Sequence, residues 1–418
     1  MVPPYVNTFF MSETFTKPFN GLLYNKEKID DISRVVCPPY DVISNPTDYY
    51  ERSSQNAIRL ELPVASGAMD QYTNAKHIMD EWLEKEILLP DKKEAIYIYE
   101  QEFEIEHVSF LRRGFIALHK LDKQRILTHE ETRKKAKADR EQLIGTLKTF
   151  TSLIFGLYED KNNEIENIMT GMQKEKIYDF VDEQSIRNRF YRMTDADAIN
   201  RLVSIMAAKK IYIADGHHRL DVSYRLNLPY VPLYLTNMYS PGIVILPYHR
   251  TITFEKAHPL NEMLDLLKDY TEVSRQPYTG NDSVKAALTT VSASVKPSFV
   301  LYSKEDLQNL YVVTEKRPFP PYAETNIHEC LKKLKVNVIH SGIIKNLLKI
   351  KDEEISFTQD HYESIDFIRK GSLDLAFFLP PTSVEEVRDI AENSLYMPAK
   401  STFFYPKILT GLVFCKYA

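Results

Sequence analysis

Residues 213–220, with the sequence IADGHHRL, combine an aspartate, a glycine, two histidines and an arginine directly behind an apolar run. The whole chain has only 12 glycines and 11 histidines, so a glycine next to two histidines is an unusual concentration. These residue types are typical of a phosphate-binding turn, although a polar loop also contains them. Which chemistry applies depends on the elements that flank the turn.

The flanking sequence predicts a strand that ends at Ala214 and a helix that begins at His217. Glycine accepts backbone angles that other residues resist, so Asp215-Gly216 fits a tight turn between the two elements. The first N–H groups of a helix have no partner within the helix and lie at its positive end, where anions bind. Residues 215–219 are therefore the predicted phosphate site.

The side chains of this turn add to the same chemistry. His218 and Arg219 fall in the first helical turn, and the planar fork of arginine fits a phosphate with two hydrogen bonds. Histidine donates to phosphate oxygens or carries a proton near neutral pH, which makes His218 a catalytic candidate. Asp215 is expected either to cap the helix or to hold a magnesium ion beside the phosphates. His217 and His218 are not expected to share a metal ion, because neighbouring helix positions point about 100° apart.

The alternative to a phosphate site is a purely structural turn. An Asp-Gly turn before a helix is common, and its aspartate often serves only as a cap. Two histidines and an arginine at the mouth of the helix favour the functional interpretation, because so many polar groups are costly to bury without a partner.

A second carboxylate of interest, Asp41, follows the segment Pro38-Pro39-Tyr40. The prolines fix the backbone, so that Asp41 is presented from a loop. It is a candidate general base or magnesium ligand, and the alternative is an ordinary cap or turn residue.

The stretch 129–140, HEETRKKAKADR, alternates acidic and basic residues. It begins like the zinc motif HExxH, but Arg133 stands where the second histidine ligand belongs, so a zinc peptidase is not expected. Arg133 and Arg140 are two helical turns apart on one face, where they could bind a phosphate or an anionic substrate. His129 and Glu130 complete the set, with Glu130 as a further candidate base. The alternative is a solvated helix with charge pairs.

The elements that must position these residues alternate between strand and helix patterns. Residues 94–106 form a predicted strand, and residues 107–119 are either its antiparallel partner or its continuation. The charged stretch 130–148 ends in a helical pattern. The alternation predicts an α+β or mixed α/β fold. Further strands are expected at 152–158, 211–214, 230–235, 243–246, 299–302, 310–314 and 373–379, and helices at 195–208, 217–226, 260–267, 338–348 and 384–392.

Composition narrows the classes of protein that fit. The chain has 418 residues and a net charge of −5, which does not favour a protein that coats nucleic acid through counterion release. Its three cysteines are far apart and lack metal-type spacing, which indicates a reducing compartment. No signal peptide or bilayer-spanning run is recognised, so we expect a cytoplasmic protein without a membrane partner. The Walker-type and dinucleotide-binding glycine motifs are absent.

The IADGHHR stretch resembles the second box of the ParB/sulfiredoxin-like superfamily, in which a strand is followed by a turn that opens a phosphate-binding helix. The same form resembles the free-serine kinases of that superfamily. It is also similar to a widespread prokaryotic family of unknown function, whose further motifs match elsewhere in this chain. Those matches are RVVCPPYDVIS at 34–44, HEETRKKAKADR at 129–140 with SLIF at 152–155, ILPYHR at 245–250, SIDF at 364–367 and MPAKSTFFYPKILTGL at 397–412.

Two departures limit the resemblance. Sulfiredoxins have a cysteine where this chain has His217, so a reductase that acts through that thiol is excluded. ParB proteins carry a basic helix-turn-helix, and no such segment is found here. His249 and Arg250 are expected either to close the pocket or to end a strand with a charge. The C-terminal motif adds Lys400, Tyr405 and Lys407.

The resemblance implies a ParB/sulfiredoxin-like phosphate-binding domain over residues 17–255 and a C-terminal α/β domain over 256–418, with residues 1–16 as a tail. It also implies a nucleotide ligand, ATP or ADP or else CTP, with magnesium. The implied activity is transfer of a phosphoryl group to a small hydroxylated metabolite such as free serine, with Asp41 or Glu130 as the base.

The alternative function is that of a non-catalytic module, which binds a nucleotide and changes shape to engage a protein partner. A DNA-binding regulator is disfavoured by the net charge. The sequence leaves open whether the chain forms a homodimer.

Overall fold

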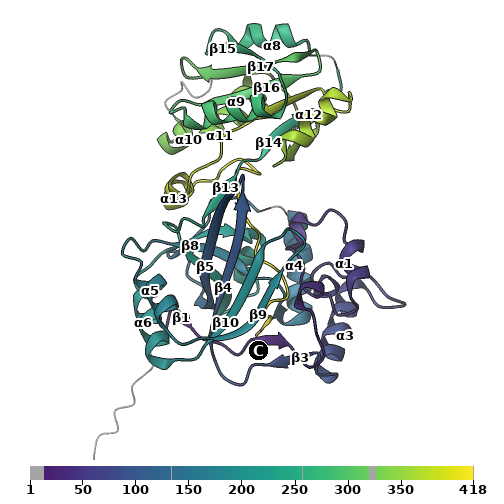
Figure 1. Cartoon of the computed structure of the whole chain (residues 1–418), viewed down its shortest axis with the longest axis vertical. Helices are drawn as coiled ribbons and strands as arrows, with labels where there is room; N and C mark the ends of the chain where they lie inside the picture. Colours follow the sequence, from purple (N-terminus) through teal and green to yellow (C-terminus); the bar gives the residue numbers. More distant parts are fainter. Residues whose placement is uncertain (1–13, 133, 257, 320–325, 418) are drawn as a thin grey trace, which may run out of the picture. The chain divides into compact units, whose positions relative to one another are not determined.

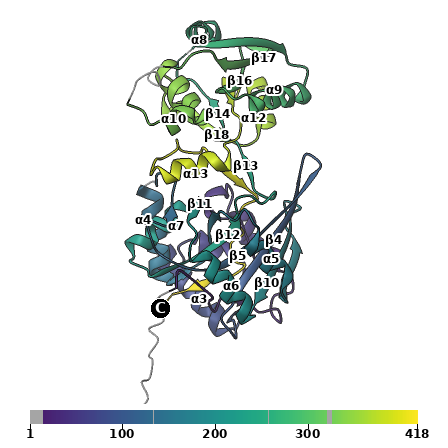
Figure 2. The same ribbon diagram turned by 90° about the vertical axis from the view of Figure 1, so that its left-hand side faces the viewer.

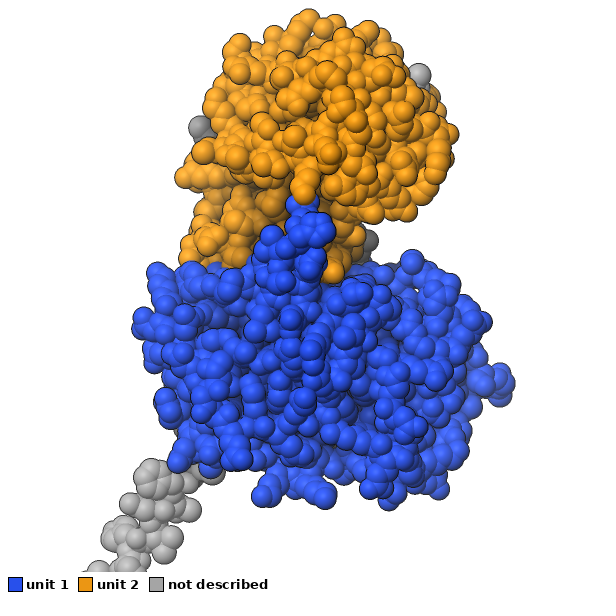
Figure 3. All heavy atoms as spheres, in the orientation of Figure 1, with its two compact units in different colours: residues 1–127, 132–243, 406–418 blue, residues 128–131, 244–405 orange. Residues whose placement is uncertain are grey.

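The computed structural model describes residues 14–132, 134–256, 258–319 and 326–417. The chain forms two compact units, which Figure 3 shows in different colours. Unit 1 contains residues 1–127, 132–243 and 406–418, and unit 2 contains residues 128–131 and 244–405. The chain thus leaves unit 1 after residue 243 and returns to it at residue 406. The expected division, with a single boundary near residue 255, does not include this return.

Unit 1 is built on one large mixed sheet. Its strands are β1 (Thr16–Lys17), β4 (Ile96–Ile105), β5 (Val108–Lys120), β6 (Ile126–Leu127), β8 (Ile154–Tyr158), β9 (Glu175–Val181), β10 (Arg187–Met193), β11 (Ile211–Asp215) and β12 (Tyr230–Asn237). The strand order is β6-β11-β8-β12-β5-β4-β10-β9, and β1 pairs with β5. Within it β11 runs antiparallel to β8, whereas β12 runs parallel to β8.

Helices cover this sheet and enclose a second core beside it. They are α1 (Thr47–Arg52), α2 (Ile58–Glu61), α3 (Gln71–Glu84), α4 (Lys134–Leu147), α5 (Glu164–Gly171), α6 (Ala196–Met206) and α7 (His217–Arg225), with short 3-10 turns η1 (Ile32–Arg34) and η2 (Tyr40–Val42). Figure 1 shows α5 and α6 on one side of the sheet and α3 and α4 on the other. Side chains of α2, α3 and α4 surround Trp82, the only tryptophan of the chain.

Two short strand pairs close unit 1. The first joins β2 (Leu22–Tyr24) to β3 (Leu88–Pro90), and the second joins β7 (Thr149–Phe150) to β21 (Cys415–Lys416). The second pair anchors the segment that returns from unit 2.

The β4–β5 hairpin shows how local sequence directs this sheet. Of the two alternatives, the antiparallel pair is confirmed, with residues 97–105 opposite 108–116. The turn residues Glu106 and His107 have φ angles of 49° and 67°, the left-handed values that a two-residue hairpin turn requires. A tight turn therefore joins two long strands that reach the centre of the sheet.

Unit 2 contains a six-stranded antiparallel sheet of order β15-β17-β16-β19-β14-β18 and a separate β13–β20 pair. Its strands are β13 (Val244–Leu246), β14 (His249–Ile252), β15 (Thr271–Pro277), β16 (Ser298–Ser303), β17 (Asp306–Glu315), β18 (Ile355–Thr358), β19 (Leu375–Phe378) and β20 (Phe403–Tyr405). Its helices are α8 (Leu260–Leu267), α9 (Asn281–Ala293), α10 (Glu329–Lys333), α11 (Lys335–Asn337), η3 (Val338–Leu347), η4 (Asp352–Glu354), α12 (His361–Arg369) and α13 (Val384–Glu392). Apolar residues of α9 and α12 form one core with β16, β17 and β19.

The expected mixed α/β fold is confirmed, with two local differences. The helix expected at 338–348 is the π-helix η3, in which hydrogen bonds span five residues rather than four. The expected tail falls mainly on residues 1–13, outside the described residues, but Phe15 is buried and Thr16 pairs with His119. Within the described ranges, no helix combines the length and the apolar character needed to cross a bilayer.

Candidate functional site

The predicted turn between a strand and a helix is confirmed at residues 215–217. β11 ends at Asp215, α7 begins at His217, and Gly216 between them has a φ of 89°. A side chain at position 216 would be strained at this angle, and its Cβ would lie 3.1 Å from the guanidinium of Arg219. Glycine is therefore required where the first turn of α7 folds back on the strand end.

The carboxylate of Asp215 lies between two cations. Lys407 Nζ is 2.9 Å from its Oδ1, and Arg219 Nη2 is 3.2 Å from its Oδ2. Burial raises the pKa of Asp215, but Lys407 and Arg219 outweigh burial and bring the pKa down to about 2. Asp215 is therefore ionised near neutral pH, and these three side chains together carry one positive charge in excess.

Arg219 is 3% exposed and is held by groups of the protein. Its Nη1 donates to the carbonyl oxygen of Leu153 at 2.6 Å, while Nη2 faces Asp215. Because β11 is antiparallel to β8, the end of β11 meets the start of β8, and Leu153 comes directly before that strand. The expected grip of both terminal nitrogens on a phosphate is therefore not the arrangement observed, and Nε is the nitrogen that has no hydrogen-bond partner.

His217 is a neutral member of the site. Its side chain is buried, and burial lowers its pKa to about 4, although the nearby Asp215 carboxylate opposes this shift. The imidazole therefore adds no charge near pH 7, and the excess positive charge comes from Lys407 and Arg219 alone.

His218 is half-buried and lies beside the N-terminal motif. Its Nδ1 is 3.3 Å from Tyr40 Oη. The ring of Tyr40 in turn packs against Arg140, whose Cζ is 4.3 Å from the ring centroid. Burial raises the pKa of Tyr40, so its hydroxyl keeps its proton and can donate a hydrogen bond. Residues of the motifs at 34–44 and 213–220 thus meet Arg140, the last residue of the 129–140 motif, in unit 1, where α4 packs beside α7 (Figure 2).

Arg140 has a different role from the one expected. Its Nε and Nη2 donate to the carboxylate of Asp139, and its Nη1 donates to the carbonyl of Glu61 at 2.9 Å. All three nitrogens have partners inside the protein, because the side chain points into the packing between α2 and α4 rather than along the face of a solvated helix. Arg140 supports the ring of Tyr40 in place of the expected grip on an anion.

Glu61 is a fully buried carboxylate that no motif marked. It accepts hydrogen bonds from Thr151 Oγ1 at 2.5 Å and Ser152 Oγ at 3.0 Å, and it lies 3.6 Å from Arg140 Nη1. These bonds fix the loop before β8, and therefore the Leu153 carbonyl that Arg219 uses. The one signal in the sequence is a lone acid between two leucines, Leu60 and Leu62.

The segment that carries Lys407 is fixed by its backbone. Arg112 donates to the carbonyl of Pro406, and Gln101 Nε2 donates to the carbonyl of Lys407 at 3.1 Å. Cys37 and Thr410 exchange a pair of backbone hydrogen bonds. The motif match drew attention to Lys407, but its contact with Asp215 spans 192 residues and appears only in the structure.

The residues present do not fit a magnesium ion held by Asp215. Both carboxylate oxygens already face cations, and a divalent ion there would lie next to two positive charges. Among the described residues, no three histidine, cysteine, aspartate or glutamate side chains are grouped to hold a metal ion. Asp215 is a counter-ion in this structure rather than the expected metal ligand.

Asp41 and Arg133 complete the predicted residues of unit 1. Asp41 follows Tyr40 in η2 and is exposed, so its carboxylate is reachable from solvent. Arg133 lies outside the described residues. A role for Asp41 as general base stays a prediction.

His129 and Glu130 belong to unit 2, not to the unit that contains the turn. His129 Nε2 is 3.3 Å from Thr402 Oγ1, and Glu130 forms a parallel β-bridge with Met397. The start of the 129–140 motif therefore pairs with the unit 2 part of the C-terminal motif, while residues 134–140 lie in α4 of unit 1.

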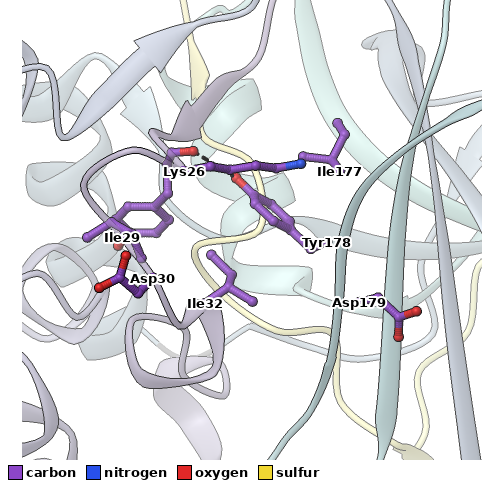
Figure 4. Close-up of a pocket in the computed structure, with 8 residues that line it drawn as sticks. Lys26, Ile29, Asp30, Ile32, Ile177, Tyr178 and Asp179 are labelled. Carbon is purple, nitrogen blue, oxygen red and sulfur yellow. Dashed lines mark hydrogen bonds between the residues drawn. The ribbon is translucent and has the colours of Figure 1, made fainter.

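A pocket of about 230 Å³ lies elsewhere in unit 1 (Figure 4). Tyr178 of β9 lines it, and its hydroxyl donates to the carbonyl of Tyr24 at 3.4 Å. Asp179, which also lines it, is already engaged in ion pairs. None of the lining residues belongs to the 215–219 turn, so this pocket is separate from the candidate site.

The fold and the site define a mixed α/β protein with a positively charged turn between a strand and a helix. The chain belongs to the family described as protein of unknown function (DUF1015), which matches residues 16–337. The resemblance to a family of unknown function is thereby confirmed. No curated protein matches the chain.

Solved structures with partial similarity include a free serine kinase in complex with AMP. It has a TM-score of 0.38 and 14% identity, over 69% of this chain and 86% of that chain. A conserved hypothetical protein from Pyrococcus furiosus gives 0.37 and 13%, over 70% and 92%. SbnI with a C-terminal truncation from Staphylococcus aureus gives 0.37 and 10%, over 71% and 86%. At these values the similarities assign no activity to the chain.

Proposed function

We propose that the chain binds a nucleotide through its phosphates at the N-terminal end of α7. The observation that carries this proposal is the pair of cations, Lys407 and Arg219, that face the Asp215 carboxylate beside the start of α7. A phosphate at the positive end of a helix is favourable, and these two cations would add to the attraction.

The groups that would contact the phosphates are Arg219 Nε, Lys407 Nζ and the imidazole of His218. Tyr40 would orient His218 through the contact at 3.3 Å. Since Asp215 is occupied by cations, magnesium would be carried by the phosphates of the nucleotide rather than by this carboxylate. The turn that opens α7 also supports the proposal that unit 1 has a ParB/sulfiredoxin-like core.

The reaction we propose is phosphoryl transfer to a small hydroxylated metabolite such as free serine. Positioning and charge neutralisation supply most of the catalysis in such reactions. The exposed carboxylate of Asp41, next to Tyr40, would accept the proton of the attacking hydroxyl.

Binding is tested by thermal unfolding with AMP, ADP, ATP and CTP, with and without magnesium. Trp82 fluorescence is the readout, because the single tryptophan is buried in unit 1. A ligand at about 100 times its Kd should raise the Tm by about 5 °C. Lys407→Ala should remove most of this shift, whereas Lys416→Ala, which removes an exposed lysine from the same segment, should not.

The activity is tested with ADP or ATP, magnesium and serine, by measuring phosphoserine. Nucleotide binding without phosphoserine would favour the alternative of a non-catalytic sensor that engages a protein partner. A wild-type Tm that no nucleotide raises, or a shift that Lys407→Ala leaves intact, would overturn the proposal itself.

A further inference from the structure

Unit 2 contains a buried guanidinium, that of Arg250, whose partners are all uncharged. Arg250 lies on β14 and is fully buried. Its Nη1 donates to the carbonyl of Tyr248 at 2.5 Å and its Nη2 to the carbonyl of Lys400 at 3.3 Å. Nε has no hydrogen-bond partner. Because a guanidinium has five N–H donors, two carbonyls leave much of its capacity unused.

Among the described residues, Arg250 has no carboxylate partner. Burial lowers its pKa to about 9, so it still carries its charge near pH 7. Across the described residues, no aspartate or glutamate forms an ion pair with it. Burial also lowers the pKa of His340 to about 4 and that of His249 to about 3, so both nearby imidazoles are neutral. The ring of Phe357, with its centroid 5.3 Å from Arg250 Cζ, also packs near the guanidinium.

Lys400 brings a second cation to the same place. Its Nζ is 3.4 Å from Tyr248 Oη, and no carboxylate in the described ranges pairs with it. The backbone of Lys400 has a φ of 58°, a left-handed value that a lysine keeps only where the surroundings impose it. Arg250 holds the Lys400 carbonyl, and Thr382 Oγ1 donates to the next carbonyl, that of Ser401, at 3.0 Å. The loop is therefore fixed with its lysine beside the buried arginine.

We propose that Arg250 and Lys400, together with the hydroxyl of Tyr248, bind a phosphoryl oxyanion within unit 2. Two cations without carboxylate partners match a ligand of about two negative charges, and a phosphate monoester carries about −1.5 to −2 at pH 7. A carboxylate would neutralise only one of the two. Arg250 Nε and Lys400 Nζ donate to separate oxygens of the ligand, which is inorganic phosphate or the phosphate of a monoester.

The competing explanation is that Arg250 has a purely structural role, because its two hydrogen bonds to carbonyls join the start of β14 to the Lys400 loop. That explanation accounts for Nη1 and Nη2. It does not account for the buried charge of Arg250, which costs free energy without a counter-ion. Nor does it account for the second cation, Lys400, whose loop Arg250 itself holds in place.

The test follows the Nε–H signal of Arg250 by nitrogen-15 NMR of the full chain, with the signal assigned by its loss in Arg250→Lys. Inorganic phosphate and glycerol 3-phosphate are added separately, against chloride at equal ionic strength. The signal should move and saturate with at least one of them, and the tighter ligand identifies the source. Lys400→Ala should raise the Kd about tenfold, the scale of one charged hydrogen bond. Lys370→Ala, an exposed lysine of the same unit, should leave it unchanged.

The inference does not depend on nucleotide binding at α7, so the Arg250 signal must still move in Lys407→Ala protein. A signal that neither phosphate moves, or an unchanged Kd in Lys400→Ala, overturns it. Should Arg250→Lys fail to fold, thermal shifts with the same ions in wild type, Lys400→Ala and Lys370→Ala decide the question.

Discussion

The chain contains two His-Arg pairs, His218-Arg219 in unit 1 and His249-Arg250 in unit 2, and the two buried arginines differ in how their charge is balanced. Arg219 faces Asp215 at 3.2 Å, and Lys407 faces the same carboxylate. Arg250 has carbonyl partners alone among the described residues. Similar residue pairs thus produce an ion cluster that includes a carboxylate in one unit and a cation without a carboxylate partner among the described residues in the other.

This difference determines how much a bound anion could add to the stability of each unit. In unit 1 the carboxylate makes the cations tolerable without a ligand, so the turn can be well ordered before anything binds. In the described part of unit 2, only carbonyl dipoles and the ring of Phe357 offset the desolvation of the Arg250 charge. A bound anion should therefore stabilise unit 2 more than unit 1.

The largest expected effect is a contrast between two substitutions. Asp215→Asn removes the carboxylate charge that faces Lys407 and Arg219 and should lower the free energy of unfolding by about 3 kcal/mol, as the loss of one partner of a buried ion pair does. Arg250→Met removes an unbalanced charge together with two carbonyl bonds and should cost only about 1 kcal/mol in phosphate-free buffer. Urea unfolding is followed by Trp82 fluorescence for unit 1 and by circular dichroism for both units. An equal loss of unfolding free energy in Asp215→Asn and Arg250→Met would contradict the proposed difference between the two arginines.

A second effect concerns pH, because both units bury neutral imidazoles. The pKa of His217 in unit 1 and that of His340 in unit 2 are each lowered to about 4 by burial. The folded protein therefore binds fewer protons than the unfolded chain between about pH 6.5 and pH 4, and stability is lost as the pH falls through this range. Each such histidine should cost up to about 1.4 kcal/mol per pH unit.

The measurement compares urea midpoints at pH 7 and pH 5. His340→Gln should flatten the pH dependence seen by circular dichroism and leave the Trp82 signal unchanged. His107→Gln, at a site whose side chain is 99% exposed, serves as the control. A pH dependence that His340→Gln leaves as steep as in the wild type would contradict the assignment.

The smallest expected effect comes from two glycines of unit 1. Gly216→Ala places a Cβ at a φ of 89° against Arg219 and should destabilise unit 1 by about 1 kcal/mol. Gly145→Ala lies inside α4 with no atom closer than 4.0 Å to the added Cβ, and should stabilise the helix by about 0.5–1 kcal/mol. Trp82-monitored unfolding measures both, and the same sign for both would show that backbone angle does not control this turn.

Individual helices and turns could be predicted from the sequence, because neighbouring residues determine where they begin and which face they bury. α8 and α13 occupy the predicted residues, 260–267 and 384–392. For α13, Ser383 and Glu386 form a capping box that fixes its start, and the apolar period fixes its buried face. The turn at Asp215-Gly216 could be predicted for the same reason, because a glycine between a strand pattern and a helical pattern indicates a tight turn.

The electrostatic partners could not be predicted in this way. Lys407 reaches Asp215 only because Arg112 and Gln101 fix the returning segment, and nothing in the local pattern of any of these residues records that contact. Glu61 was missed because its partners Thr151 and Ser152 are about ninety positions away in the chain, and no local pattern marks it. Periodicity identifies the buried faces of elements but not the charges that meet across them.

The return of the chain to unit 1 at residue 406 has a consequence for biosynthesis. The ribosome makes the Asp215 turn early and Lys407 only after the whole of unit 2. A nascent chain that stalls within unit 2 therefore displays α7 with one of its two cations missing and with β7 lacking its partner strand β21. A premature stop codon within residues 244–405 would therefore also remove Lys407 and β21 from unit 1.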